Sequence, residues 1–97
     1  MYVIRNTMYA KPGRGKELIE KLKAAIPHFE AMGPTNLRVL SDAVATTWTI
    51  AVELEVDSVS TYFDILEGRS KSPGLGEAMS GYTELVTGGK REIWKVV

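Results

Sequence analysis

The chain lacks several of the residues on which common protein chemistries depend. Its 97 residues include no cysteine and a single histidine. The absence of thiols excludes disulfides, thiolate catalysis and cysteine-based zinc sites, and a chain without disulfides suits a reducing compartment. One histidine leaves little for metal binding, so we expect no metal site.

The chain also has no excess of charge and no long apolar run. Twelve Lys and Arg balance twelve Asp and Glu, so no overall field attracts nucleic acid or an anionic membrane. No apolar run approaches the ~18 residues of a membrane span. Arg5, Asn6 and Thr7 interrupt the start, where a signal peptide would carry its apolar region. We expect a soluble cytoplasmic chain with no nucleic-acid and no membrane partner.

Residues 46–56, TTWTIAVELEV, carry the clearest pattern in the sequence. Large apolar residues alternate there with small or polar ones, at Trp48, Ile50, Val52 and Leu54. A period of two in a segment rich in β-branched and aromatic residues predicts a strand with one apolar face. The intervening residues are small enough for cover on the second side, so we place this strand in the middle of a sheet.

Three further strands are predicted on either side of this one. They cover residues 1–10, 35–41 and 90–97, where apolar and polar residues alternate less regularly. Residues 42–45 join the second strand to the central one as a hairpin, and Thr87-Gly88-Gly89 is expected to turn the chain into the last strand.

Apolar residues at helical spacing from Leu18 to Met32 predict the first helix, and Gly33-Pro34 ends it. Pro27 lies inside this pattern, where it removes a backbone hydrogen bond and crowds the preceding turn. We therefore expect a kink or a break near residues 24–26.

The second helical region is expected in two parts. The first follows Asp57 or Ser58 as N-cap and ends at Gly68. The second starts at Ser72-Pro73, with proline at the first helical position, and its apolar face continues to Val86.

The order strand, helix, strand, strand, helix, strand predicts an α+β, ferredoxin-like βαββαβ domain over residues 1–97. Its four-stranded antiparallel sheet has both helices on one face, and right-handed crossovers place the first and third strands at the centre. Two helices cover one face only, yet both sides of the strands carry large apolar residues. Because an exposed apolar sheet face usually marks an interface, we expect a homodimer through that face.

This element order, the interrupted second helix and the closing TGGKREIWKVV resemble the dimeric α/β-barrel superfamily. Its members include antibiotic-biosynthesis monooxygenases, stress-responsive barrel proteins and NIPSNAP-like proteins, and the ending is most similar to the last group. The resemblance implies a ferredoxin-like domain that pairs into a dimeric α/β barrel. Members include cofactor-free oxygenases, haem-degrading enzymes, isomerases and proteins without a known reaction, so the activity stays open.

Asn6 is the first candidate catalytic residue, because an amide is out of place in mid-strand. It resembles the first-strand asparagine of the haem-degrading members, and facing a cavity it could hold a substrate oxygen. The alternative is a hydrogen bond to a neighbouring backbone group. Those enzymes take a histidine ligand for iron from the second helix, and residues 58–86 contain no histidine. We therefore expect no cofactor.

His28 is the second catalytic candidate, because its ordinary pKa of ~6.5 suits acid–base work near neutrality. Its helical angle places it on the flank of the apolar stripe, so the alternative is a solvated rim position. Three aromatic residues are candidates for a substrate pocket, with a role in the core as the alternative: Trp48, Tyr62 and Tyr82.

Arg5 and Arg38 could bind an anionic group, although ion pairs on a solvated face are the commoner outcome. Two functions fit these observations. One is a cofactor-independent monooxygenase-like enzyme acting on a small aromatic or carbonyl compound. The other is a non-catalytic module of the same fold that binds a small apolar ligand or supports assembly. The sequence leaves open whether the protein is an enzyme.

Overall fold

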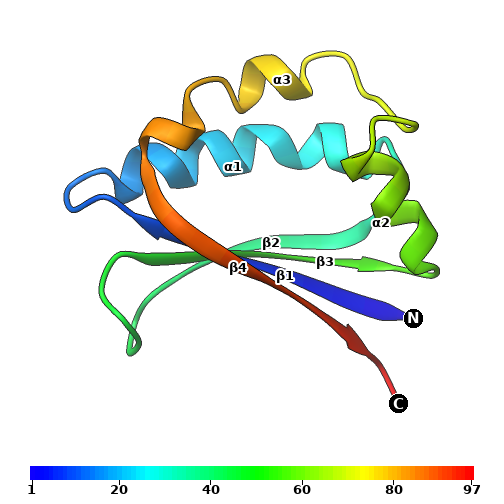
Figure 1. Cartoon of the computed structure of the whole chain (residues 1–97), viewed down its shortest axis with the longest axis horizontal. Helices are drawn as coiled ribbons and strands as arrows, with labels where there is room; N and C mark the ends of the chain where they lie inside the picture. The colour runs from blue at the N-terminus through cyan, green and yellow to red at the C-terminus, as the bar shows by residue number, and fades with distance from the viewer.

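The computed structural model describes residues 1–97. The elements follow in the order β1 (Tyr2–Ala10), α1 (Gly15–Glu30), β2 (Thr35–Ser41), β3 (Thr49–Val56), α2 (Val59–Leu66), α3 (Leu75–Ala78), the 3-10 turn η1 (Tyr82–Glu84) and β4 (Val86–Lys95). The strands form one antiparallel sheet in the order β2-β3-β1-β4, and the helices lie on one face of it (Figure 1). This is the predicted ferredoxin-like α+β fold, with the first and third strands at the centre. None of the helices combines the length and apolar character needed to cross a membrane.

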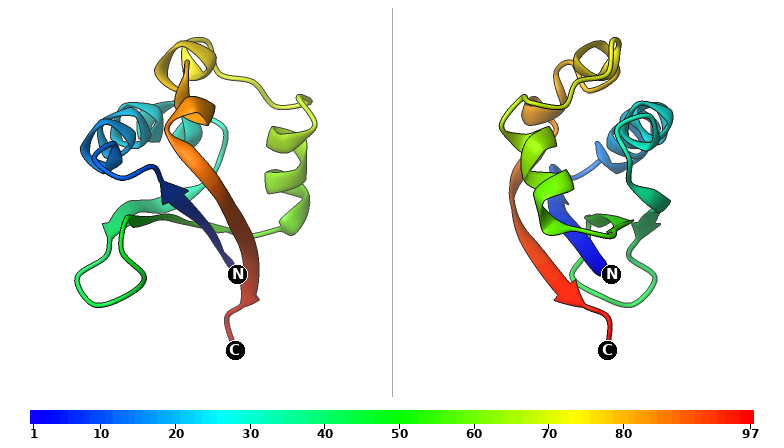
Figure 2. Two further views of the ribbon diagram at one scale, coloured as in Figure 1. Left: turned by 60° about the vertical axis from the view of Figure 1, so that its left-hand side comes forward. Right: turned by 90° about the vertical axis from the view of Figure 1, so that its right-hand side faces the viewer.

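The strand register assigns each side chain to one face of the sheet. Ile4 pairs with Leu54 and Met8 pairs with Ile50. These positions face the helices, because Ile4, Leu54 and Ile50 are buried beneath them. The residues between them, such as Val3 and Arg5, lie on the opposite face, which no element of the chain covers (Figure 2). We call this second surface the open face.

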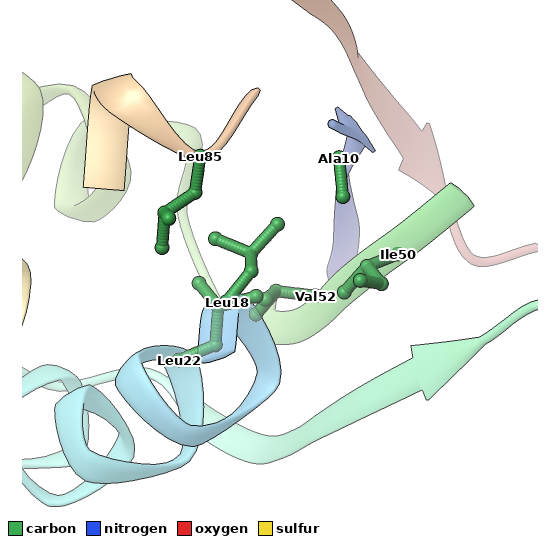
Figure 3. Close-up of a cluster of buried hydrophobic side chains, with 6 residues drawn as sticks. All are labelled: Ala10, Leu18, Leu22, Ile50, Val52 and Leu85. Carbon is green, nitrogen blue, oxygen red and sulfur yellow. The ribbon is translucent and has the colours of Figure 1, made fainter. Parts of the chain in front are cut away.

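The core lies between α1 and the two central strands. Leu18 and Leu22 of α1 point toward Ile50 and Val52 of β3, and Leu85 closes the cluster from the side of η1 (Figure 3). A second cluster lies under α2 and consists of Ile4, Leu54, Val56 and Tyr62. The alternation predicted for the central strand is therefore confirmed from Ile50 onward.

Trp48 does not belong to that alternation, because β3 begins one residue later. Its φ of 64° is left-handed, which is uncommon for a bulky residue and turns the chain out of the extended conformation. The indole remains 39 % exposed and packs against the start of α1, where a Cβ on Gly15 would lie 3.3 Å from the ring. The prediction of Trp48 as part of the apolar strand face is wrong.

The last strand begins earlier than predicted. β4 starts at Val86, so Thr87, Gly88 and Gly89 are part of the strand instead of a turn before it. Gly89 pairs with Met8, and a Cβ at Gly89 would collide with the carbonyl oxygen of Thr7. Gly89 therefore permits close approach of the two strands, a use of glycine that resembles a turn signal in sequence.

The helices depart from prediction in two places. α1 runs unbroken through Pro27, because only one backbone bond is lost and the buried stripe of the helix holds it on the sheet. The second helical region is interrupted as predicted, and Ser58 caps α2 by accepting a hydrogen bond from the backbone N–H of Ser60. The expected cap at Ser72 is wrong, since α3 starts after Gly74, which has a φ of 92°.

Glu53 is held between two arginines on the open face. Arg5 and Arg38 flank it on the neighbouring strands, at 2.6 and 2.5 Å between the charged atoms. The ion-pair alternative for both arginines is thus confirmed. Hydrogen bonds from Arg38, followed by those from Arg5 and the charges of both, hold the pKa of Glu53 below its ordinary value of 4.5, although burial acts the other way.

Replacing Leu54 with alanine should lower the free energy of unfolding by about 2–5 kcal/mol, because this buried side chain would leave a cavity. Val44→Ala, on the fully exposed hairpin loop, should change it by less than about 0.5 kcal/mol. Urea unfolding followed by circular dichroism measures both. Equal effects at the two positions would contradict the assignment of Leu54 to the core.

Replacing Glu53 with glutamine should lower stability at neutral pH by on the order of 1–3 kcal/mol, because two charge-assisted contacts are lost. A lowered folded-state pKa stabilises the protein fully above 4.5, and this contribution disappears as the pH falls through the folded value. The difference between wild type and variant should therefore shrink below about pH 4.5. Unfolding curves at several pH values test this, with Glu84→Gln, an exposed carboxylate without an ion pair, as control. A difference that grows on acidification would refute it.

Candidate functional site

A cavity of about 660 Å³ lies between the helical layer and the edge of the sheet formed by β1 and β4. Sixteen residues line it, and nine of them are hydrophobic. The apolar wall comes from α2 through Tyr62, Ile65 and Leu66, and from the following segment through Leu75, Met79 and Tyr82. A cavity of this size and character can enclose a small organic molecule.

The floor of the cavity is formed by the two paired strands. Gly89, which pairs with the helix-facing Met8, contributes no side chain there. The glycine that the close approach of the strands requires at 89 therefore also keeps this part of the floor free of a side chain. Asn6 and Arg91 follow next along these strands, directly opposite each other in the register.

A chain of three polar side chains crosses the cavity floor. The Nε of Arg91 donates to Oδ1 of Asn6 at 2.7 Å, and Nδ2 of Asn6 donates to the hydroxyl of Tyr62 at 2.9 Å. The guanidinium of Arg91 also lies 5.3 Å from the centre of the Tyr62 ring, in a cation–π arrangement. Arginine can only donate, so the amide oxygen of Asn6 must face it and the amide nitrogen must face Tyr62.

This direction of donation has a chemical consequence at Tyr62. Its oxygen accepts from Asn6, and no protein acceptor takes its own hydrogen. Tyr62 is only 2 % exposed, yet it lines the cavity. A buried hydroxyl with a spare hydrogen is suited to donate to an oxygen atom of a bound molecule.

The structure brings together three of the residues predicted for a site. Asn6, Tyr62 and Tyr82 all line the cavity. Asn6 forms hydrogen bonds to two side chains, Tyr62 and Arg91. The alternative of a hydrogen bond to a neighbouring backbone group is therefore not what the structure shows. Both the nitrogen and the oxygen of its amide make a hydrogen bond, which makes Asn6 a positioning residue for Tyr62.

His28 and Trp48 do not line the cavity. Nδ1 of His28 lies 3.4 Å from the hydroxyl of Ser72, and its ring packs beside Gly74 in the loop before α3. Trp48 packs against the start of α1. The cavity therefore offers no histidine ligand for a haem iron, and no group of three or more His, Cys, Asp or Glu side chains lies close enough to hold a metal ion.

Arg91 is the residue that sequence reasoning did not single out. Its position opposite Asn6 depends on the start of β4 at Val86 and on the register with β1. A last strand predicted to begin at residue 90 did not define which residue of β1 lies opposite Arg91. The one available signal was that Arg91, a charged residue, lies two positions before the apolar Ile93, so both side chains point to the same face of the sheet.

Comparisons with known proteins support the fold. No family model matches the chain, and no characterised protein matches it by sequence. Among solved structures, a proposed antibiotic biosynthesis monooxygenase from Bordetella bronchiseptica is 13 % identical, with a TM-score of 0.79 over 99 % of this chain and 96 % of that one.

Two further structures extend this likeness. An uncharacterised NIPSNAP domain protein from Burkholderia xenovorans is 12 % identical, with a TM-score of 0.78 over 100 % of this chain and 95 % of that one. A proposed antibiotic biosynthesis monooxygenase from Chloroflexus aurantiacus is 20 % identical, with a TM-score of 0.71 over 99 % and 92 %. The chain therefore has the fold of the NIPSNAP and antibiotic-biosynthesis-monooxygenase-like proteins, as the sequence resemblance predicted.

Proposed function

We propose that the protein binds a small aromatic or carbonyl compound in the cavity and oxidises it as a cofactor-independent monooxygenase. The observation that carries this proposal is the buried hydroxyl of Tyr62, held by Asn6 and Arg91 with its hydrogen free inside an apolar cavity. The names of structures with the same fold, two of them proposed antibiotic biosynthesis monooxygenases, point to the same chemistry.

In such a reaction an activated CH₂ group loses a proton, and the resulting anion transfers one electron to O₂. The two radicals combine to form a C–O bond, and the resulting peroxide anion takes back a proton to become a hydroperoxide. Loss of water from the hydroperoxide leaves a carbonyl group. Negative charge develops on the substrate oxygen in the first step. Tyr62 would donate to that oxygen, and the donors behind it would strengthen this hydrogen bond because they polarise one another.

A non-catalytic ligand-binding module is the second candidate. It is favoured by the absence of any carboxylate or histidine from the cavity lining, which leaves the removal of the substrate proton without an evident base. The apolar wall and the Tyr62 hydroxyl serve binding equally well.

We further propose that a second copy of the chain covers the open face. Apolar side chains remain exposed at both ends of that face, including Trp94 at 52 % and Leu40 at 38 %. Between them Glu53 is already paired with Arg5 and Arg38, so an apposed copy would not leave this buried carboxylate without a counter-charge. If the two-fold axis of the dimer passes near Glu53, the exposed apolar side chains at the ends of one open face would lie against those of the other copy. The cytoplasmic location and the lack of nucleic-acid and membrane partners stay predictions.

Replacing Tyr62 with phenylalanine should lower turnover by about 10²-fold or more, because one hydrogen-bond donor to the developing oxyanion is removed. An oxygen electrode measures O₂ uptake with a panel of phenols and cyclic ketones, and calorimetry measures binding of the same compounds. Tyr9→Phe, on the open face, is the matched control. Binding by the wild type without any O₂ uptake would favour the non-catalytic module and rule out the oxygenase.

Native mass spectrometry of the wild type should give about twice the 10.7 kDa mass of the chain. Trp94→Glu should give a folded monomer, because a charge on the open face cannot be buried without a partner. Phe63→Glu, at an aromatic residue of α2 that is 43 % exposed, should remain a dimer. A wild-type monomer at working concentration would refute the proposed assembly.

A further inference from the structure

Arg91 differs from every other arginine in the protein. Arg5 and Arg38 share Glu53, Arg14 pairs with Glu17, and Arg69 pairs with Asp64 and Glu67. Arg91 alone makes no ion pair, and its one hydrogen bond to protein goes to the neutral amide of Asn6. In a chain with equal numbers of acidic and basic residues, the arginine that borders the cavity is thus the one left without a counter-charge.

The position of Arg91 is nevertheless fixed. Its Nε is held by Asn6, and its guanidinium lies over the ring of Tyr62. The remaining N–H groups, on the two Nη atoms, have no partner in the protein. A guanidinium held at one edge presents the other N–H groups as a planar fork, which matches the two oxygens of a carboxylate.

The charge of the cavity agrees with this geometry. Arg91 borders it from a helix-facing position of β4, and no aspartate or glutamate lines it. An aspartate at position 6 would occupy the same space as Asn6 and neutralise Arg91, whereas the amide holds the guanidinium and leaves its charge in place. The rest of the lining is largely apolar, so the favoured ligand has an apolar body and one anionic end.

We propose that the cavity selects a monocarboxylate with a compact apolar body, whose carboxylate binds the Nη groups of Arg91 while the body lies against α2 and η1. This inference rests on the proposed function, since it names the ligand class of the same cavity. The Tyr62 hydroxyl then meets an oxygen of the body, or one of the carboxylate oxygens.

The test compares two pairs of probes that share an apolar body, one member anionic and the other neutral: naphthalene-1-carboxylate with naphthalene-1-carboxamide, and hexanoate with hexanamide. Calorimetry or protein NMR at low salt and neutral pH measures the affinity of each. Wild type should bind at least one carboxylate about tenfold or more tightly than its amide, the gain expected of a charge-assisted hydrogen bond. This preference should weaken as salt is added, because Arg91 borders solvent.

Three variants locate the effect. Arg91→Gln should remove the preference for the carboxylate. Asn6→Asp should remove it as well, because an internal carboxylate would then occupy Arg91. Arg14→Gln, which deletes an exposed arginine outside the cavity, should keep it. Amide binding by each variant reports whether the cavity itself is intact.

The outcomes separate this inference from the function on which it rests. Equal binding of carboxylate and amide by the wild type, or a preference that survives Arg91→Gln, would overturn the carboxylate proposal and leave the cavity as a site for neutral compounds. Failure of every probe, charged or neutral, to bind the wild type would overturn both.

Discussion

The pairing of β4 with β1 depends on a position where no side chain fits. A Cβ at Gly89 would collide with the carbonyl oxygen of Thr7, so the two strands can approach only because this residue is glycine. Once they pair there, the register continues and places Arg91 opposite Asn6. Gly89 also leaves its helix-facing position on the cavity floor without a side chain. The same glycine therefore allows the register of the polar residues on the floor and keeps its own position there free.

Glu53 on the open face and Arg91 on the helix-facing side of the sheet differ in whether their charge is paired. On the open face, Glu53 is buried to 3 % exposure and two arginines compensate it. On the helix-facing side, Arg91 meets an amide and keeps its charge uncompensated. A compensated cluster suits a surface that another protein surface can cover, because this carboxylate already has its counter-charges. An uncompensated cation beside an apolar cavity suits a ligand that brings its own negative charge.

The fold by itself says little about the reaction. Proteins with this arrangement share high structural similarity with the chain at identities of 20 % or less, and their names range from monooxygenase to NIPSNAP. The proposed function rests instead on the residues that line the cavity in this chain. In that proposal the Tyr62 hydroxyl serves oxygenation or binding, and Arg91, which makes no ion pair, narrows the class of ligand for either.

The sequence by itself determined the order of the elements, the central place of β1 and β3, the interruption of the second helical region and the resemblance in fold. These features follow from local periodicity and from the handedness of crossovers, both of which are properties of the chain over short distances. Asn6 could be singled out as an amide that is unusual in a predicted strand, and Tyr62 and Tyr82 as aromatic residues that could line a pocket. Only the tertiary structure decided that Trp48 and His28 lie outside the cavity. It also decided that Gly88 and Gly89 belong to β4 and that Arg91 donates a hydrogen bond to Asn6. Those outcomes depend on register and on contacts between residues as many as 85 positions apart, for which local periodicity carries no signal.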